Sequence, residues 1–167
     1  MFDFDKFCSG LSLVRFGSVL KCFVLSLLVF LFFVLMSGLD FVVHRVLYGY
    51  GLMFDYDWAV FYWSIYASVF FAFGVIVGFV YWLGSNRSFV DVKVSFGLFL
   101  TVCLLFLGGL ADVLWFAIWG GGLPGDDVVW WWTLWYRFLG FWNSFAQLAL
   151  LFGVFVVVVL FWFSVLR

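Results

Sequence analysis

The chain has 167 residues, of which 68% are hydrophobic and only 10% charged, and its mean hydropathy is +1.25. A soluble domain of this length is nearer half apolar and a quarter charged, so an ordinary water-soluble domain is excluded. The formal charge of −1 provides no basic surface for nucleic acid, and we expect no nucleic-acid partner.

Four long stretches of mostly apolar residues predict four transmembrane helices, because about 20 such residues cross a bilayer. The predicted helices cover residues 22–39, 58–83, 94–118 and 138–165. The stretches are much longer than barrel strands and lack period-2 alternation, which favours helices over a membrane barrel. We therefore predict an all-α polytopic membrane protein in which residues 1–167 form a single membrane domain.

Residues 40–54 are harder to place, because they are largely apolar and yet contain Asp40, His44 and Arg45. Continuing the first helix through this stretch would make it about 50 Å long, whereas the hydrocarbon core is about 30 Å thick. We therefore expect the first helix to end near Leu39 and residues 40–54 to form an interfacial or re-entrant segment.

Lysine and arginine are distributed unevenly between the predicted loops. Six of the eight lie in the N-terminal tail, in the second loop and at the C-terminus, whereas the first and third loops hold only Arg45 and Arg137 beside five aspartates. The positive-inside rule therefore predicts that both termini lie on the same, negatively charged side. The N-terminal tail also lacks the short apolar core and cleavage site of a secretory signal, and its aspartates argue against a transit peptide.

A cluster of tryptophans precedes the fourth predicted helix. It consists of Trp130, Trp131, Trp132 and Trp135. Tryptophan is enriched where membrane helices meet the head-group region, so we expect these four side chains to form part of an interfacial aromatic belt.

The choice of apolar residues indicates a biased gene. The chain contains 26 valines but 3 isoleucines, and it has no glutamate. Phe, Leu, Val, Gly, Trp and Cys, which can all be encoded with U and G alone, make up 111 of the 167 residues. Such a bias is typical of organellar genomes and edited organellar transcripts, which favours the mitochondrial inner membrane. A bacterial inner-membrane protein with unusual codon usage is the alternative.

Asp112 is the clearest candidate for a functional residue, because it lies inside the third apolar stretch. A carboxylate at the bilayer centre costs roughly 2.5–3.5 kcal/mol on insertion scales, so we expect it to face protein or water. It is a candidate for a proton pathway or for helix pairing. The alternative is a carboxylate that reaches the interface from the end of its helix.

Two pairs of residues are spaced four apart on predicted helices and therefore share a face. Asn143 and Gln147 are expected to form hydrogen bonds with a neighbouring helix. Gly74 and Gly78 are expected to let another helix approach the second span closely.

No recognised catalytic motif is present, and the three cysteines are scattered without a zinc or disulfide pattern. We therefore predict no catalytic residues and no metal site in this chain. Whether the chain contributes to an enzyme depends on the complex to which it belongs.

The residues Ile65-Tyr66-Ala67-Ser68-Val69 resemble the Tyr-x-Gly-Ala run of the mitochondrially encoded subunit 6 of NADH dehydrogenase. The length, the helix count and the U/G-type composition are also similar to that family. The resemblance implies a non-catalytic membrane subunit of respiratory complex I without a cofactor of its own. Such a subunit packs among other membrane subunits and lipid, and Asp112 would be its candidate for proton translocation.

A second resemblance involves His44, Asp55 and Tyr56, whose spacing is His-x10-Asp-Tyr. This pattern is similar to the haem-ligand histidine and the quinone-side Asp-Tyr pair in the small membrane anchor of succinate dehydrogenase. It implies haem b as a cofactor and ubiquinone as a ligand. The alternatives are that His44 is an interfacial residue without a role, and that the chain is a scaffold or assembly subunit without chemistry.

Overall fold

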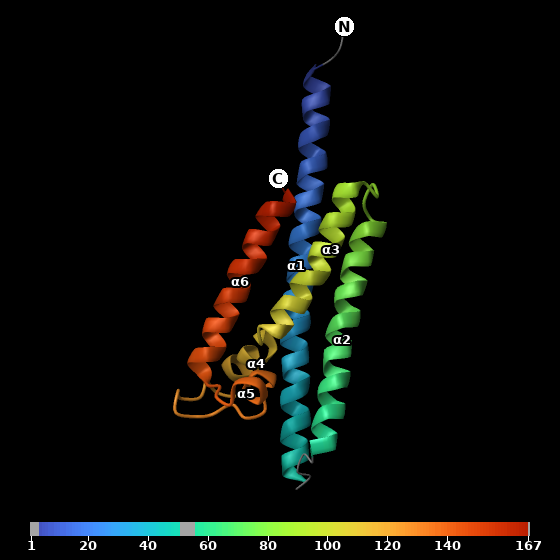
Figure 1. Cartoon of the computed structure of the whole chain (residues 1–167). Helices are drawn as coiled ribbons and strands as arrows, with labels where there is room; N and C mark the ends of the chain where they lie inside the picture. The colour runs from blue at the N-terminus through green and yellow to red at the C-terminus, as the bar shows by residue number, and fades with distance from the viewer. Residues whose placement is uncertain (1–3, 51–55, 167) are drawn as a thin grey trace. The chain divides into compact units, whose positions relative to one another are not determined.

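A computed structural model describes residues 4–50 and 56–166 (Figure 1). Within these residues all regular structure is helical, and four helices are long and apolar enough to cross a membrane. The candidate spans are Phe23–Val46, Phe61–Leu83, Phe89–Leu107 and Ser144–Val165. The prediction of an all-α polytopic fold is therefore confirmed.

The chain divides into two compact units, one up to Phe32 and one from Phe33 onward. The first unit contains the N-terminal part of helix α1 (Phe4–Gly49). The second contains the rest of α1, α2 (Tyr56–Leu83), α3 (Phe89–Leu107), α4 (Leu110–Leu114), a π-helical segment η1 (Trp115–Trp119), α5 (Leu134–Leu139) and α6 (Ser144–Leu166). That residues 1–167 form a single membrane domain stays a prediction.

Helix α1 does not end near Leu39, so the predicted end of the first helix is wrong. It continues through Asp40 and His44 to Gly49, so residues 40–49 are helical rather than re-entrant, whereas residues 51–54 of the predicted segment lie outside the described residues. The reason is that Asp40, which suggested a helix end, is buried against α2 and accepts a hydrogen bond there. A buried carboxylate with a donor can stay inside a helix, whereas an unpaired one could not.

The third predicted helix, residues 94–118, is broken at Gly108 and Gly109. Helix α3 begins at Phe89, where Ser88 and Asp91 form a capping box, and it ends at Leu107. Gly109 has φ +72°, a left-handed conformation that glycine adopts without steric cost. The chain then resumes as α4 and η1, and Trp119 of η1 donates a hydrogen bond of 3.2 Å to Ser37 of α1.

Helices α2 and α3 pack against each other as an antiparallel pair (Figure 1). The approach is closest at Gly78, where an added Cβ atom would lie 2.7 Å from the backbone oxygen of Ser95. Ser95 uses this proximity to donate a hydrogen bond of 2.7 Å to the carbonyl of Gly78. The prediction that glycine allows close approach on the second span is confirmed.

The last span begins later than the predicted residue 138. The short helix α5 ends at Leu139 and is capped by Gly140, which has φ +71°, and α6 starts at Ser144. Asn143 precedes α6 and accepts a hydrogen bond of 3.0 Å from the backbone N–H of Ala146, which caps the helix. The loop before α6 also contributes, since Asp126 accepts a hydrogen bond of 3.1 Å from the N–H of Phe145.

Candidate functional site

A buried polar contact joins α1 and α2 inside the apolar spans. Asp40 of α1 is 8% exposed, and its carboxylate accepts a hydrogen bond from the hydroxyl of Tyr62 in α2. A carboxylate in a lipid-embedded helix is costly unless it is paired, and acids in such positions commonly serve in ion or proton pathways. This contact is therefore the starting point of the candidate site.

His44 lies one helical turn after Asp40 and contacts the same carboxylate. Its Nδ1 is 3.1 Å from Oδ1 of Asp40 and 2.9 Å from the Asp40 carbonyl oxygen. The imidazole also packs edge-on against the ring of Tyr62, with centroids 5.7 Å apart. One carboxylate, one imidazole and one phenol thus form a compact group in which each can donate or accept a proton.

Two further ionisable residues border this group. Tyr66 is buried and stacks on Tyr62, with ring centroids 5.8 Å apart. Asp112 of α4 is half-buried, and it lies close enough to Asp40 and His44 for their charges to act on it. We call these five residues, Asp40, His44, Tyr62, Tyr66 and Asp112, the polar cluster.

A cavity of about 350 Å³ adjoins the polar cluster at Asp112. Its walls come from α2, the end of α3, Gly109, Asp112 and the segment from Trp132 to Arg137. Most of the wall is aromatic or aliphatic. Asp112 brings a carboxyl group to it and Arg137 a guanidinium group. A space of this size lies within the range of small-ligand sites, although near the lower end.

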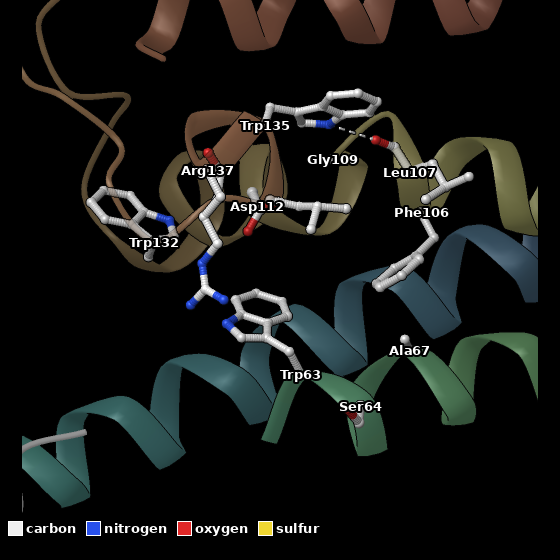
Figure 2. A pocket seen from close by; sticks show the side chains of 12 residues that line it. Trp63, Ser64, Ala67, Phe106, Leu107, Gly109, Asp112, Trp132, Trp135 and Arg137 are labelled. Carbon is white, nitrogen blue, oxygen red and sulfur yellow. Dashed lines mark hydrogen bonds between the residues drawn. The ribbon is translucent and has the colours of Figure 1, made fainter. Parts of the chain in front are cut away.

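The side chains around the cavity come from separate parts of the chain (Figure 2). Arg137 extends from α5 toward the ring of Trp63 in α2, and Asp112 enters from α4 (Figure 2). Trp135 is held in place by a hydrogen bond of 3.2 Å from its ring N–H to the carbonyl of Leu107. The cavity thus exists because α5 folds back over the break between α3 and α4.

Gln147 stabilises that break. Its amide Nε2 donates a hydrogen bond of 2.7 Å to the carbonyl of Gly108, and its Oε1 accepts one of 2.8 Å from Trp142. In an unbroken helix the Gly108 carbonyl would bond to residue 112, so Gln147 replaces a lost helical partner. Gln147 is only 1% exposed, and a Cβ atom at Gly109 would collide with its amide.

Asn143, which shares a face with Gln147, contacts the preceding loop. Its Nδ2 donates a hydrogen bond of 2.9 Å to the carbonyl of Asp126.

The predicted tryptophan belt needs one correction, since Trp130 is fully buried, whereas Trp131 is 61% exposed. Trp130 packs on Phe116, with centroids 4.9 Å apart, because the loop turns it inward.

The haem and quinone alternative involves His44, Asp55 and Tyr56, of which the structure describes only the side chain of His44. Asp55 and the side chain of Tyr56 lie outside the described residues. His44 lines neither this cavity nor a second one between α2 and α3, and its Nδ1 contacts Asp40. Within the described part of the chain no group of three or more His, Cys, Asp or Glu side chains could hold a metal ion. The haem and quinone alternative therefore stays a prediction.

The sequence alone indicated Asp112 and His44 but missed Asp40, Tyr62 and Tyr66. A signal for Asp40 was available, because Asp40 and His44 are four residues apart in an apolar stretch and so share a helix face. Nothing in the sequence paired them with Tyr62, since that contact joins two helices. No family model, curated protein or solved structure matches this chain.

Proposed function

We propose that this chain is a non-catalytic integral membrane subunit of an organellar respiratory-chain complex in the mitochondrial inner membrane, of the NADH dehydrogenase subunit 6 type. In this proposal the polar cluster takes part in proton translocation, and the remaining helix surface packs against other membrane subunits. The hydrogen bond between Tyr62 and Asp40 inside the apolar spans is the observation that carries it.

The composition of the polar cluster supports proton transfer. Asp40, His44 and Tyr62 are in direct contact, and each has a group that exchanges a proton. Asp112 lies within electrostatic reach of this trio and also borders the cavity, so it connects the buried group with a more open space. Carboxylate and histidine chains within membrane spans are typical of proton relays.

The exposed surface of α6 supports a partner subunit. Phe145, Phe152 and Phe163 are each at least 67% exposed. Their spacings of 7 and 11 residues place them on one stripe of the helix. Large aromatic side chains aligned in this way can pack against a helix of a partner subunit, because buried aromatic residues contribute much of the binding energy at protein interfaces.

The proposal is tested by Asp40→Asn and Asp112→Asn in the purified complex, with electron transfer and proton pumping measured together. We expect normal assembly and at least about a tenfold loss of coupled proton transfer, as for the removal of a proton-transfer group. Asp127→Asn, in an exposed loop, is the matched control and should pump normally. Normal proton pumping in both Asp40→Asn and Asp112→Asn would contradict the proton-transfer role and favour a scaffold subunit without chemistry. Purification of the chain as a small monodisperse monomer would contradict its role as a subunit.

A further inference from the structure

The indole N–H of Trp115 in η1 is buried and forms no hydrogen bond with the described residues, a feature that it shares with Trp130. Trp119 of the same segment does have an acceptor, since its ring N–H donates to Ser37. A buried donor without an acceptor is destabilising and rare in folded proteins. The Trp115 N–H therefore points to an acceptor that it meets in another protonation state of the protein.

The carboxyl group of Asp112 lies one helical turn before Trp115. The backbone stays helical between the two residues, because the N–H of Trp115 bonds to the carbonyls of Ala111 and Asp112. Side chains three residues apart are neighbours on a helix, and long side chains lean toward the helix N-terminus, so the Trp115 ring covers the turn that contains Asp112. The Asp112 carboxyl group accepts no hydrogen bond from the described residues.

The orientation of the Trp115 ring suits a contact with Asp112. A Cβ atom added at Gly120 would lie 2.9 Å from Cζ3 of Trp115, so the six-membered edge of the indole lies against Gly120. Nε1 is at the opposite edge, and the N–H therefore faces away from the C-terminal end of η1, which is the direction of Asp112. The ring also packs edge-on against Phe41, with centroids 5.3 Å apart, beside the Asp40 carboxylate whose charge acts on Asp112.

We infer that Trp115 is a positioning residue for Asp112, whose ionised carboxylate accepts a hydrogen bond from the Trp115 indole N–H. A charge-assisted hydrogen bond stabilises a buried carboxylate, and the need for it ends when the carboxyl group binds a proton. The indole itself neither gains nor loses a proton, because its N–H is only a donor.

The other charged and titratable groups around Asp112 do not fill this role. They are Asp40 and His44 of α1, Tyr62 and Tyr66 of α2, and Arg137 of α5 on the cavity wall. A negative charge on Asp40 repels one on Asp112, which makes a donor at Asp112 more important. The inference does not depend on the proposed function, because it concerns the ionisation of Asp112 and not proton pumping.

Infrared spectroscopy of the purified full chain, in the assembly with which it purifies, tests the inference. The C=O band of the protonated Asp112 carboxyl group, assigned by its loss in Asp112→Asn, is followed as the pH is raised. We expect the midpoint of this titration to rise by about one pH unit or more in Trp115→Phe, because the ionised form loses a charge-assisted hydrogen bond.

A reciprocal measurement uses the unaltered chain with isotope-labelled indole nitrogen, so it does not require Trp115→Phe to fold. The ring N–H resonance of Trp115 should shift with the same pH midpoint as the Asp112 band, and in Asp112→Asn it should no longer shift. Trp119→Phe is the matched control, because it removes an indole of the same segment whose N–H already bonds to Ser37. Trp130→Phe removes the other unpartnered indole N–H. Both controls should keep the Asp112 midpoint unchanged.

An unchanged or lower midpoint in Trp115→Phe would overturn the inference, as would an equal rise in Trp119→Phe. A Trp115 resonance that does not respond to the ionisation of Asp112 would overturn it as well. Normal proton pumping in Asp112→Asn together with a raised midpoint in Trp115→Phe would contradict the proposed function and still support the contact between Trp115 and Asp112.

Discussion

Tyr62 of α2 donates its hydroxyl hydrogen bond to the carboxylate of Asp40 in α1, so a phenol and an acid join two helices within the apolar spans. The contact also explains why α1 passes through Asp40 without ending. Lipid offers no replacement donor, so the carboxylate depends for its stability on the Tyr62 hydroxyl and on the neighbouring His44 ring. The partner of Asp40 is therefore the first target for substitution.

We expect Tyr62→Phe to destabilise the protein by about 1–3 kcal/mol, because a buried carboxylate loses its phenol donor and keeps only the contact with His44. The ring and its stacking on Tyr66 are kept, so the loss reports the hydroxyl alone. Thermal unfolding in detergent, followed by circular dichroism, measures the effect. Tyr50→Phe is the control, because Tyr50 is 80% exposed and its hydroxyl reaches solvent or head groups. Equal stability of both variants would mean that the Tyr62 bond contributes nothing.

Gly78 should not accept a side chain. A Cβ atom there would lie 2.7 Å from the Ser95 backbone oxygen, so Gly78→Val must separate α2 from α3. We expect the free energy of unfolding to fall by about 1–3 kcal/mol, in the range of overpacking substitutions, or the protein to fail to assemble. Gly153→Val on α6 is the matched control, since nothing lies within 4 Å of its added Cβ. If both variants were equally stable, the close approach at Gly78 would be wrong.

Gln147→Leu should weaken the connection between α6 and the break after α3. The substitution removes the donor to the Gly108 carbonyl and the acceptor for the Trp142 ring N–H. Because two buried groups are then left unpaired, we expect the free energy of unfolding to fall by about 2–4 kcal/mol. Hydrogen exchange at the amides of α4 should rise as well. Ser164→Ala, at an exposed position of the same helix, should change neither quantity.

The loop between α2 and α3 and the loop before α6 should face opposite sides of the membrane. Single cysteines at Asn86 and at Asp127, introduced after Cys8, Cys22 and Cys103 are replaced, are expected to react with an impermeant maleimide from opposite sides. Asp127 is preferred to Asp126 because the Asp126 carboxylate caps α6. Labelling of both positions from one side would contradict the four-span topology.

The sequence determined the class of fold. Its four apolar stretches are long enough to span a bilayer, and lipid requires their backbones to form helices. The positions of these stretches in the sequence therefore predict four transmembrane helices. The sequence also indicated where side chains must be small, as at Gly78, because spacing along one helix follows directly from the helical period.

Only the tertiary structure decided where these helices end and which polar residues meet. Asp40 suggested a boundary until Tyr62 on another helix supplied its donor. The break at Gly109 depends on Gln147, a residue 38 positions later, whose amide replaces the missing helical partner. The cavity walls likewise come from α2, α4 and α5. Interactions within one helix are set by local periodicity, whereas a buried polar group is satisfied by whichever helix packs against it.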